Sequence, residues 1–222
     1  MLFLDVHTHK IYSNENVFSI VNTYPNSTSF SQPFSIGIHP WFINQETLKE
    51  ELLFVEHQLQ KDNCFAVGEC GLDKLSKTDL DIQKDVFKKQ VALSEKYQKP
   101  IIIHCVRAHQ EIIAIKKEVN PKQVWILHGF HKSKQLAENC IKNGLMLSFG
   151  AAFIKNKKLQ ETFLALPLSS IVLETDDNEI DISEIYKKAS EIKNISVENL
   201  QQKITQNFIN LIPQAQRGFN DL

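Results

Sequence analysis

The chain has 222 residues, of which 42% are hydrophobic and 23% are charged, and its formal net charge is −1. The ordinary apolar fraction and small net charge exclude an intrinsically disordered protein, and no apolar run approaches the ~18 residues of a membrane span. Lys and Arg total 25 against 26 Asp and Glu, with arginine at two positions, so no global basic field favours nucleic acid or an anionic membrane.

Short apolar or β-branched runs recur along the chain, and each predicts a strand. In chain order they are Leu2–Val6, Val17–Asn22, Phe34–Ile38, Cys64–Gly68, Ile101–His104, Val124–Leu127, Leu145–Phe149 and Ile171–Leu173. Apolar residues at spacings of three and four predict helices between and after the later runs. These helices cover 46–60, 79–97, 107–119, 133–143, 182–192 and 200–211, with Asp79 and Ser133 as expected N-caps.

Strands that alternate with helices favour a parallel sheet, and eight strands fit an α/β fold of the (β/α)8 TIM-barrel type. An open doubly wound sheet is the alternative, but its glycine-rich phosphate turn after the first strand is missing. Residues 10–16 are too few for a crossover helix, and residues 23–33 are rich in Ser, Thr, Asn and Pro. We therefore expect a single barrel domain over residues 1–222 that lacks the helices after strands one and two.

Histidine and carboxylate side chains collect where the predicted strands end. His7 and His9 close the first strand, and because strand side chains alternate, both project to the same side. Four later strands end in Glu69, His104, His128 and Asp176. The C-terminal strand ends of a barrel converge on one rim, so four imidazoles and two carboxylates there suit two divalent ions bridged by a carboxylate.

Each of these residues taken alone has a plainer interpretation. His7 and His9 fit a hydrogen-bonded pair, Glu69 fits a salt-bridged carboxylate, and His104 or His128 fits a satisfied core histidine. Their shared position at the same end of five strands favours the metal site.

Other residues beside these strand ends have weaker signals. His39 follows the third strand, so we expect it to contact substrate, whereas His131 fits a phosphate contact or a loop role equally well. His57 lies on a predicted helix and is expected to be exposed. Cys70 and Cys105 have no evident base beside them, and we expect them to pack as small apolar groups.

Six segments carry a resemblance to a known family. They are Phe3-Leu4-Asp5-Val6-His7-Thr8-His9, Gly37-Ile38-His39-Pro40, Val67-Gly68-Glu69-Cys70-Gly71-Leu72-Asp73, Pro100-Ile101-Ile102-Ile103-His104, His128-Gly129-Phe130 and Leu173-Glu174-Thr175-Asp176. In this order they resemble the TatD family of metal-dependent hydrolases, within the wider amidohydrolase-type barrels. The resemblance implies a (β/α)8 fold, bound divalent metals and phosphodiesterase activity, usually that of a DNase.

The resemblance also implies roles for individual residues. It makes Glu69 the bridging carboxylate and Asp73 a neighbour of the site. The implied metal ligands are His7, His9, Glu69, His104, His128 and Asp176. The chain departs from the family where Arg107 stands three residues after His104 instead of two, and where Asp177-Asn178 follows Asp176 in place of Ser-Pro or Ala-Pro. These departures concern the loops that select the substrate.

We therefore expect a metal-dependent hydrolase, namely a TatD-type deoxyribonuclease with two divalent ions (Mg²⁺, Mn²⁺ or Zn²⁺) that acts on DNA or a small phosphodiester. Asp176 is the expected base, beside Glu69, and should reach the metals from the side opposite His7 and His9. The expected phosphate contacts are His39, His131, Lys74 and Arg107. Amide or ester hydrolysis, phosphomonoester cleavage and a metal-binding adaptor without catalysis are the alternatives.

The expected location is the cytoplasm, and no membrane partner is expected. The first residues, Met1-Leu2-Phe3-Leu4-Asp5, lack the pattern of a secretory signal. The four cysteines are too few and too scattered for a disulfide framework or a CxxC zinc site.

Overall fold

The computed structural model describes residues 2–11 and 14–211, and these contain eight strands, eight α-helices and one 3-10 helix. The strands are β1 (Phe3–Thr8), β2 (Val17–Thr23), β3 (Phe34–Ile36), β4 (Cys64–Asp73), β5 (Ile101–Val106), β6 (Trp125–Leu127), β7 (Leu145–Phe149) and β8 (Ile171–Leu173). The helices are α1 (Leu48–Gln58), α2 (Leu80–Tyr97), α3 (His109–Val119), α4 (Lys134–Lys142), α5 (Ala152–Lys155), α6 (Lys157–Ala165), α7 (Ile182–Lys193) and α8 (Val197–Leu211), with the 3-10 turn η1 at Leu168–Ser170.

All eight predicted strands are present, and the strand pairings are parallel. Between the described parts of β1, β2 and β3 there is no helix, as expected from the short and loop-like segments there, and the first helix begins at Leu48. The predicted (β/α)8 fold class is therefore confirmed. Within residues 2–11 and 14–211, no helix combines the length and the hydrophobicity that crossing a bilayer requires.

The chain divides into two compact units. The first unit comprises the residues up to Ile20 together with those from His128 onward, and the second unit comprises Val21–Leu127. The prediction of one domain over residues 1–222 stays a prediction.

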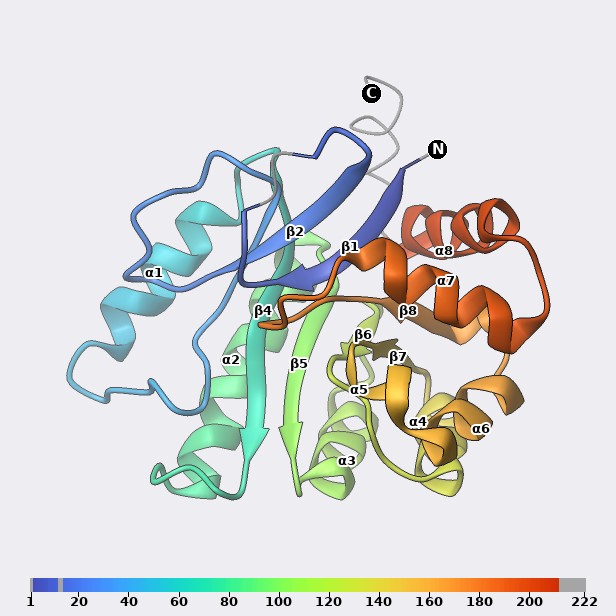
Figure 1. The fold of residues 1–222 in the computed structure, drawn as a ribbon. Coiled ribbons are helices and arrows are strands. Elements are labelled where there is room, and N and C mark those ends of the chain that lie inside the picture. Colours follow the sequence, from blue (N-terminus) through green and yellow to red (C-terminus); the bar gives the residue numbers. More distant parts are fainter. Residues whose placement is uncertain (1, 12–13, 212–222) are drawn as a thin grey trace. The chain divides into compact units, whose positions relative to one another are not determined.

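In the second unit, strand neighbours follow chain order from the end of β2 to β6. Figure 1 shows β4 and β5 side by side, with α2 against β4. Behind them the ring centroids of Phe87 and Trp125 lie 5.2 Å apart in the core, and both side chains are fully buried. This packing makes β4 and β5 a firm support for the polar side chains that they carry.

In the first unit, β7 pairs with β8, and α7 and α8 pack against β1 and β8. Tyr186 of α7 is fully buried, and its hydroxyl donates to the carbonyl oxygen of Leu4 and accepts from the Leu4 N–H. These two hydrogen bonds fasten the start of β1 to α7, and they thereby hold the strand that leads to His7 and His9.

Two local features differ from the prediction. The strand β4 runs to Asp73 instead of ending at Gly68, because all ten of its residues are buried and its glycines allow it to approach β5 closely. Glu69 therefore lies within a strand and not at its end. The short helices α5 and α6 are not among the predicted elements; Asn156 separates them, and its side chain caps α6 by accepting from the Leu159 N–H.

Candidate metal centre

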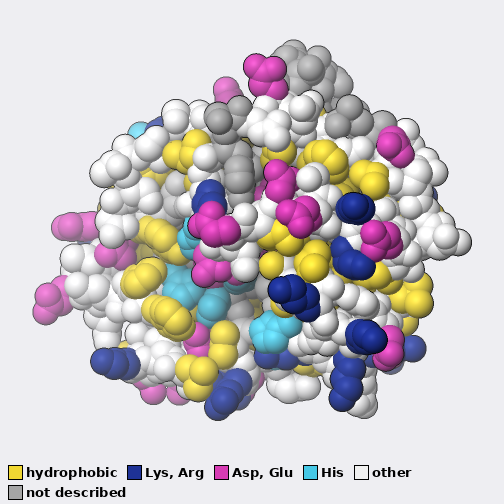
Figure 2. Space-filling view, viewed as in Figure 1, with side chains coloured by type: hydrophobic (Ala, Val, Ile, Leu, Met, Phe, Trp, Pro, Cys, Tyr) yellow, Lys and Arg dark blue, Asp and Glu magenta, His cyan; other side chains and the backbone are white. Residues whose placement is uncertain are grey.

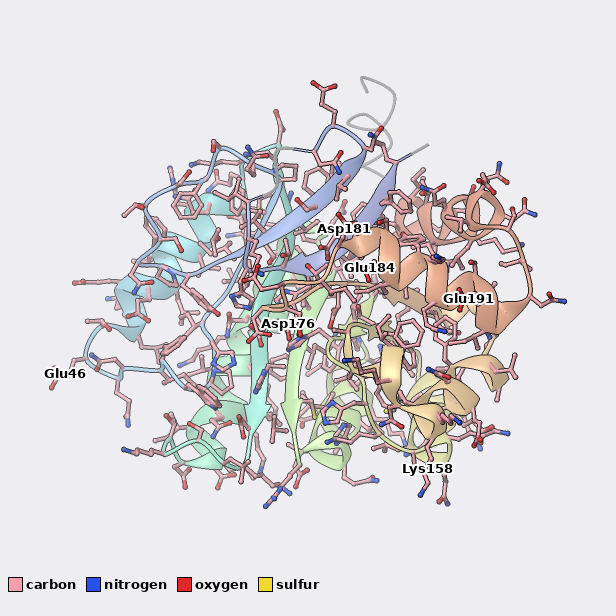
Figure 3. All side chains as sticks on the ribbon, viewed as in Figure 1. Glu46, Lys158, Asp176, Asp181, Glu184 and Glu191 are labelled. Atoms are coloured by element: carbon pink, nitrogen blue, oxygen red, sulfur yellow. The ribbon has the colours of Figure 1, made fainter. Side chains whose placement is uncertain are left out.

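Asp176 is held by the backbone of β1. Its N–H donates to the carbonyl oxygen of His7 at 2.9 Å, and its carbonyl oxygen accepts from the N–H of His9 at 3.1 Å. Together these bonds form a parallel bridge between Asp176 and Thr8. The segment after β8, on which Figure 3 labels Asp176, is thus attached to β1 between the two histidines.

The same bridge brings the side chains together. The Asp176 Oδ1 atom lies 3.5 Å from Nε2 of His7 and 3.4 Å from Nε2 of His9. The pairing with Thr8 turns the carboxylate toward the two imidazoles. The side from which Asp176 reaches the metals, relative to His7 and His9, stays a prediction.

A third imidazole completes this group, which we call the Asp176 cluster: His7, His9, His128 and Asp176. The ring centroids of His7 and His128 are 4.5 Å apart, and ligand atoms of His7, His128 and Asp176 lie within 4.8 Å of one another. Imidazole nitrogens with one carboxylate oxygen are a donor set that suits Zn²⁺ and other divalent ions. The residues of the Asp176 cluster thus fit a divalent cation.

The charge state of Asp176 follows from these contacts. Burial raises the pKa of its carboxyl group, but the hydrogen bonds from His7 and His9 outweigh this effect and hold the pKa well below its usual range. The carboxylate is consequently ionised, which is the form that binds a cation.

Buried carboxylates support the cluster from behind. Asp5 accepts from the N–H and the hydroxyl of Thr175 at 3.0 and 2.6 Å, and burial raises its pKa to about 7. Glu174 is fully buried; its Oε1 accepts from the Gly129 N–H at 2.5 Å and lies 3.7 Å from Nδ1 of His128. Glu174 thus faces the imidazole of His128, as carboxylates behind ligating histidines do, whereas Asp5 holds Thr175, the residue before Asp176. Neither Asp5 nor Glu174 has a predicted role.

The second unit holds another group, which we call the Glu69 cluster: Glu69, Asp73 and His104. His104 Nδ1 lies 2.7 Å from Glu69 Oε1, while its Nε2 lies 3.1 Å from Asp73 Oδ2. Burial raises the pKa of Asp73, whereas hydrogen bonds from Leu75, His104 and Trp41 lower it. The hydrogen bonds have the larger combined effect, so the pKa lies below its usual value. Asp73 thus orients the imidazole so that Nδ1 faces Glu69, and ligand atoms of His104 and Glu69 belong to a group that could hold one cation.

Asn22 of β2 positions Glu69. Its Oδ1 accepts from the Glu69 N–H at 2.8 Å, and its Nδ2 donates to Glu69 Oε2 at 3.3 Å. No role was predicted for Asn22, because an asparagine has no metal-ligating signal of its own. Its place at the end of the predicted strand Val17–Asn22, where the other candidate residues also stand, is the signal that could have found it.

His39 stands beside Glu69 but has a different hydrogen-bonding role. Its Nδ1 accepts from the backbone N–H of Trp41 at 3.2 Å, so the proton of the neutral ring is on Nε2, which lies 3.4 Å from Glu69 Oε1. In this tautomer Nε2 donates toward Glu69 Oε1, and ligand atoms of His39, Glu69 and His104 also lie within 4.8 Å of one another, as donors to one ion do. The contact of His39 with substrate stays a prediction.

The remaining predicted contacts lie in varied surroundings. Lys74 is ion-paired with Glu111 at 2.5 Å, and Arg107 is exposed with a left-handed φ of 56°. His131 is exposed, and its Nδ1 lies 2.7 Å from the carbonyl oxygen of Gly129. His57 is exposed as expected. Cys70 is fully buried, and burial raises the pKa of its thiol, so it packs and is no nucleophile.

An α/β fold of eight parallel strands, with clusters of histidines and carboxylates on and beside these strands, is the architecture of metal-binding (β/α)8 proteins. Within that class, the TatD related DNase family model matches residues 3–213, and the chain belongs to this family.

Individual relatives agree with this family. The chain is 36% identical over 146 residues to the metal-dependent hydrolase YabD of Bacillus subtilis, and 29% identical over 145 residues to the 3'-5' ssDNA/RNA exonuclease TatD of Erwinia tasmaniensis. These matches cover 64% and 63% of this chain, and 57% and 56% of the relatives. The chain thus spans little more than half the length of these curated relatives.

Solved structures share the fold. The TatD homologue YjjV of Escherichia coli superimposes with a TM-score of 0.78 at 21% identity, covering 95% of this chain and 98% of that chain. A TatD family hydrolase of Entamoeba histolytica gives a TM-score of 0.77 at 18% identity, with coverage of 95% and 98%. At these identities the likeness concerns the fold alone.

Proposed function

We propose that this chain is a divalent-metal-dependent hydrolase that cleaves phosphodiester bonds in DNA. The observation that carries the proposal is the position of Asp176. One of its carboxylate oxygens, Oδ1, lies within 3.5 Å of two imidazole nitrogens, and a backbone bridge to Thr8 holds it there. Such preorganisation is what a metal ligand requires, because the donors are in place before the ion arrives. Membership of the TatD related DNase family supports the choice of phosphodiesters.

The proposal assigns two ions. His7, His9, His128 and Asp176 would hold one, and Glu69 with His104 would hold the other; the bridging role that the family resemblance gives Glu69 stays a prediction, as does the identity of the metal as Mg²⁺, Mn²⁺ or Zn²⁺. Divalent cations in such sites polarise a phosphoryl oxygen and lower the pKa of a coordinated water.

The protein's own groups have complementary roles. The ionised carboxylate of Asp176 accepts a proton from the attacking water. The Nε2–H of His39 is a donor that suits a phosphate oxygen, since its other nitrogen is occupied by the Trp41 N–H. Asp73 and Glu174 keep His104 and His128 in their orientations. His131 and Arg107 are exposed and remain proposed phosphate contacts, whereas Lys74 must first leave Glu111. The cytoplasmic location also stays a prediction.

A substrate panel tests the proposal. The chain is stripped with a chelator and assayed with Mg²⁺, Mn²⁺ or Zn²⁺ on end-labelled DNA, a phosphomonoester, a lactone and an N-acyl amino acid. We expect DNA cleavage that requires an added metal. Turnover limited to the lactone, the amide or the monoester would contradict the proposal, and so would DNA cleavage that survives in chelator.

A further inference from the structure

Large apolar side chains are exposed beside the Glu69 cluster. Trp41 is 59% exposed and Phe42 is 58% exposed, and both directly follow His39 and Pro40. Leu75, on the loop after β4, is 60% exposed. Figure 2 shows hydrophobic side chains gathered next to histidines on the face that it displays. Exposed aromatic groups of this size beside polar functional residues indicate a binding surface.

Both aromatic rings are held in place from below. The Trp41 indole N–H donates to Asp73 Oδ2 at 2.6 Å, and its ring centroid lies 6.2 Å from that of His104. The Phe42 N–H donates to the His39 carbonyl oxygen at 2.9 Å, and its ring is 5.4 Å from His39. Because both residues are fixed by these contacts and are still more than half exposed, they are preorganised and lose little entropy when a ligand covers them.

A cavity opens beside Phe42. Its volume is about 270 Å³, and it is lined in part by Tyr24, Asn26, His39 and Phe42. The ring centroids of Tyr24 and Phe42 are 5.4 Å apart at an interplanar angle of 86°. Pockets for drug-sized ligands begin near ~300 Å³, so this cavity suits one flat heterocycle and not a larger group.

The charges nearby do not favour binding through phosphate alone. Lys74, directly after Asp73, is ion-paired with Glu111 at 2.5 Å. Glu51 also lines the cavity, and its carboxylate accepts from the Thr47 hydroxyl. A nucleic acid bound here must therefore gain its affinity from its bases, and stacking on aromatic rings is the interaction that supplies it with little dependence on sequence.

Resting on the proposed phosphodiesterase function, we propose that Trp41 and Phe42 form a stacking platform for the unpaired bases of single-stranded nucleic acid, with one base entering the cavity that Tyr24 and Phe42 line. The phosphodiester bond next to a stacked base then lies beside His39 and the Glu69 cluster. Bases inside a duplex are already stacked and paired, so the platform selects single strands over double strands.

Tryptophan fluorescence tests the platform without catalysis. The chain has two tryptophans, of which Trp125 is fully buried and Trp41 is exposed. In chelator, a short oligothymidylate should quench the fluorescence of Trp41, while an abasic oligomer of equal length should not. In Trp41→Phe, the remaining signal from Trp125 should be insensitive to the oligothymidylate. Equal quenching by the abasic oligomer would overturn the platform.

Kinetics give a second measurement. The KM for an abasic single strand is divided by the KM for a single strand that carries its bases. In Phe42→Leu this ratio should be about 5- to 150-fold smaller than in the wild type, which is the range for loss of one stacked base. Leu53→Ala, a change at an equally exposed apolar residue of α1 (57% exposed), should leave the ratio as in the wild type. An unchanged ratio in Phe42→Leu overturns the platform and leaves the proposed function standing. Quenching by bases without any hydrolysis overturns the proposed function and leaves the platform standing.

Discussion

At the residue scale, Asp176 pairs with the backbone at the end of β1 and places its carboxylate beside His7 and His9. The residue has a left-handed φ of 58°, and its N–H and carbonyl groups pair with His7 and His9. A non-glycine residue in this conformation is costly, and such strain is typical of functional positions. The backbone hydrogen bonds therefore fix the position of the Asp176 side chain beside the two histidines.

Asp176→Asn separates holding a metal from using it. Asparagine keeps the shape, the backbone bridge and one oxygen ligand, but it cannot accept a proton from water. We expect a folded protein that retains at least one metal and loses turnover on DNA by about 10²-fold or more. Steady-state kinetics with metal analysis on the same sample checks this. Full activity at unchanged metal content would assign the base to another group.

Lys99 allows a prediction about pH. Its side chain is 5% exposed, its Nζ donates to the carbonyl oxygen of Cys64 at 2.5 Å, and burial lowers its pKa below the ordinary 10.5. Between the pKa of Lys99 in the folded chain and its pKa of 10.5 in the unfolded chain, the unfolded chain binds more protons, so stability rises with pH. The stability linked to Lys99 is therefore fully present above pH 10.5 and is lost as the pH falls through the folded pKa.

In Lys99→Met this contribution disappears. Denaturant unfolding midpoints from neutral pH to about 10.5 should therefore rise less with pH, or fall more, in the variant than in the wild type. Parallel pH profiles for the two proteins would contradict the assignment to Lys99.

Residues with conspicuous chemistry were predictable from the sequence, whereas residues that act through other residues were not. His7, His9 and Asp176 are reactive types at strand ends, and the structure brings them together. Asn22 and Glu174 contact ligand candidates only because strands far apart in sequence are neighbours in space. The position of the Asp176 carboxylate beside His7 and His9 likewise depends on the bridge between Thr8 and Asp176, which no local pattern encodes.

At the scale of elements, close approach of β4 to β5 positions Glu69 and His104. Gly71 pairs with His104 in the sheet register, has a φ of 148°, and leaves no room for a Cβ beside the His104 carbonyl oxygen. A side chain at this position would push the two strands apart exactly where they carry polar groups. The continued pairing of Cys70–Asp73 with Ile103–Val106 explains why β4 extends beyond its predicted end.

Gly71→Ala and Gly129→Ala form a matched pair. Both glycines have positive φ, but a Cβ at Gly129 would meet its nearest neighbour at 4.0 Å, so only backbone strain applies there. We expect Gly129→Ala to lower the free energy of unfolding by about 1–3 kcal/mol, and Gly71→Ala to lower it by more than ~4 kcal/mol or to prevent folding. Urea unfolding measures both, and equal losses would show that space beside His104 is not limiting.

The order of strands and helices was predictable because the spacing of apolar residues reflects which face of each element is buried. Asp79 and Ser133 cap α2 and α4 as expected, since capping is a local interaction. The helices α5 and α6 were not predicted, because each is short and Asn156 interrupts their apolar pattern.

At the scale of the whole molecule, the charge balance limits how nucleic acid can bind. With a net charge of −1 and 25 Lys and Arg against 26 Asp and Glu, few side chains are available to displace counterions. Single-stranded DNA affinity should fall with salt with a log–log slope of about −0.7 to −2, equivalent to one to three neutralised phosphates. Fluorescence titrations at several salt concentrations give this slope, and a value for six or more phosphates would reveal a long basic groove.

The central claim is that the Asp176 and Glu69 clusters bind divalent cations, and metal stoichiometry tests it most directly. The stripped chain is incubated with excess Mn²⁺ or Zn²⁺, freed of unbound ion by gel filtration, and measured by elemental analysis. We predict about two equivalents for the wild type. His7→Ala and Glu69→Gln should each lower this number, whereas His57→Ala, a change at an exposed histidine of α1, should not. Equal metal content in His7→Ala, Glu69→Gln and His57→Ala would contradict the account.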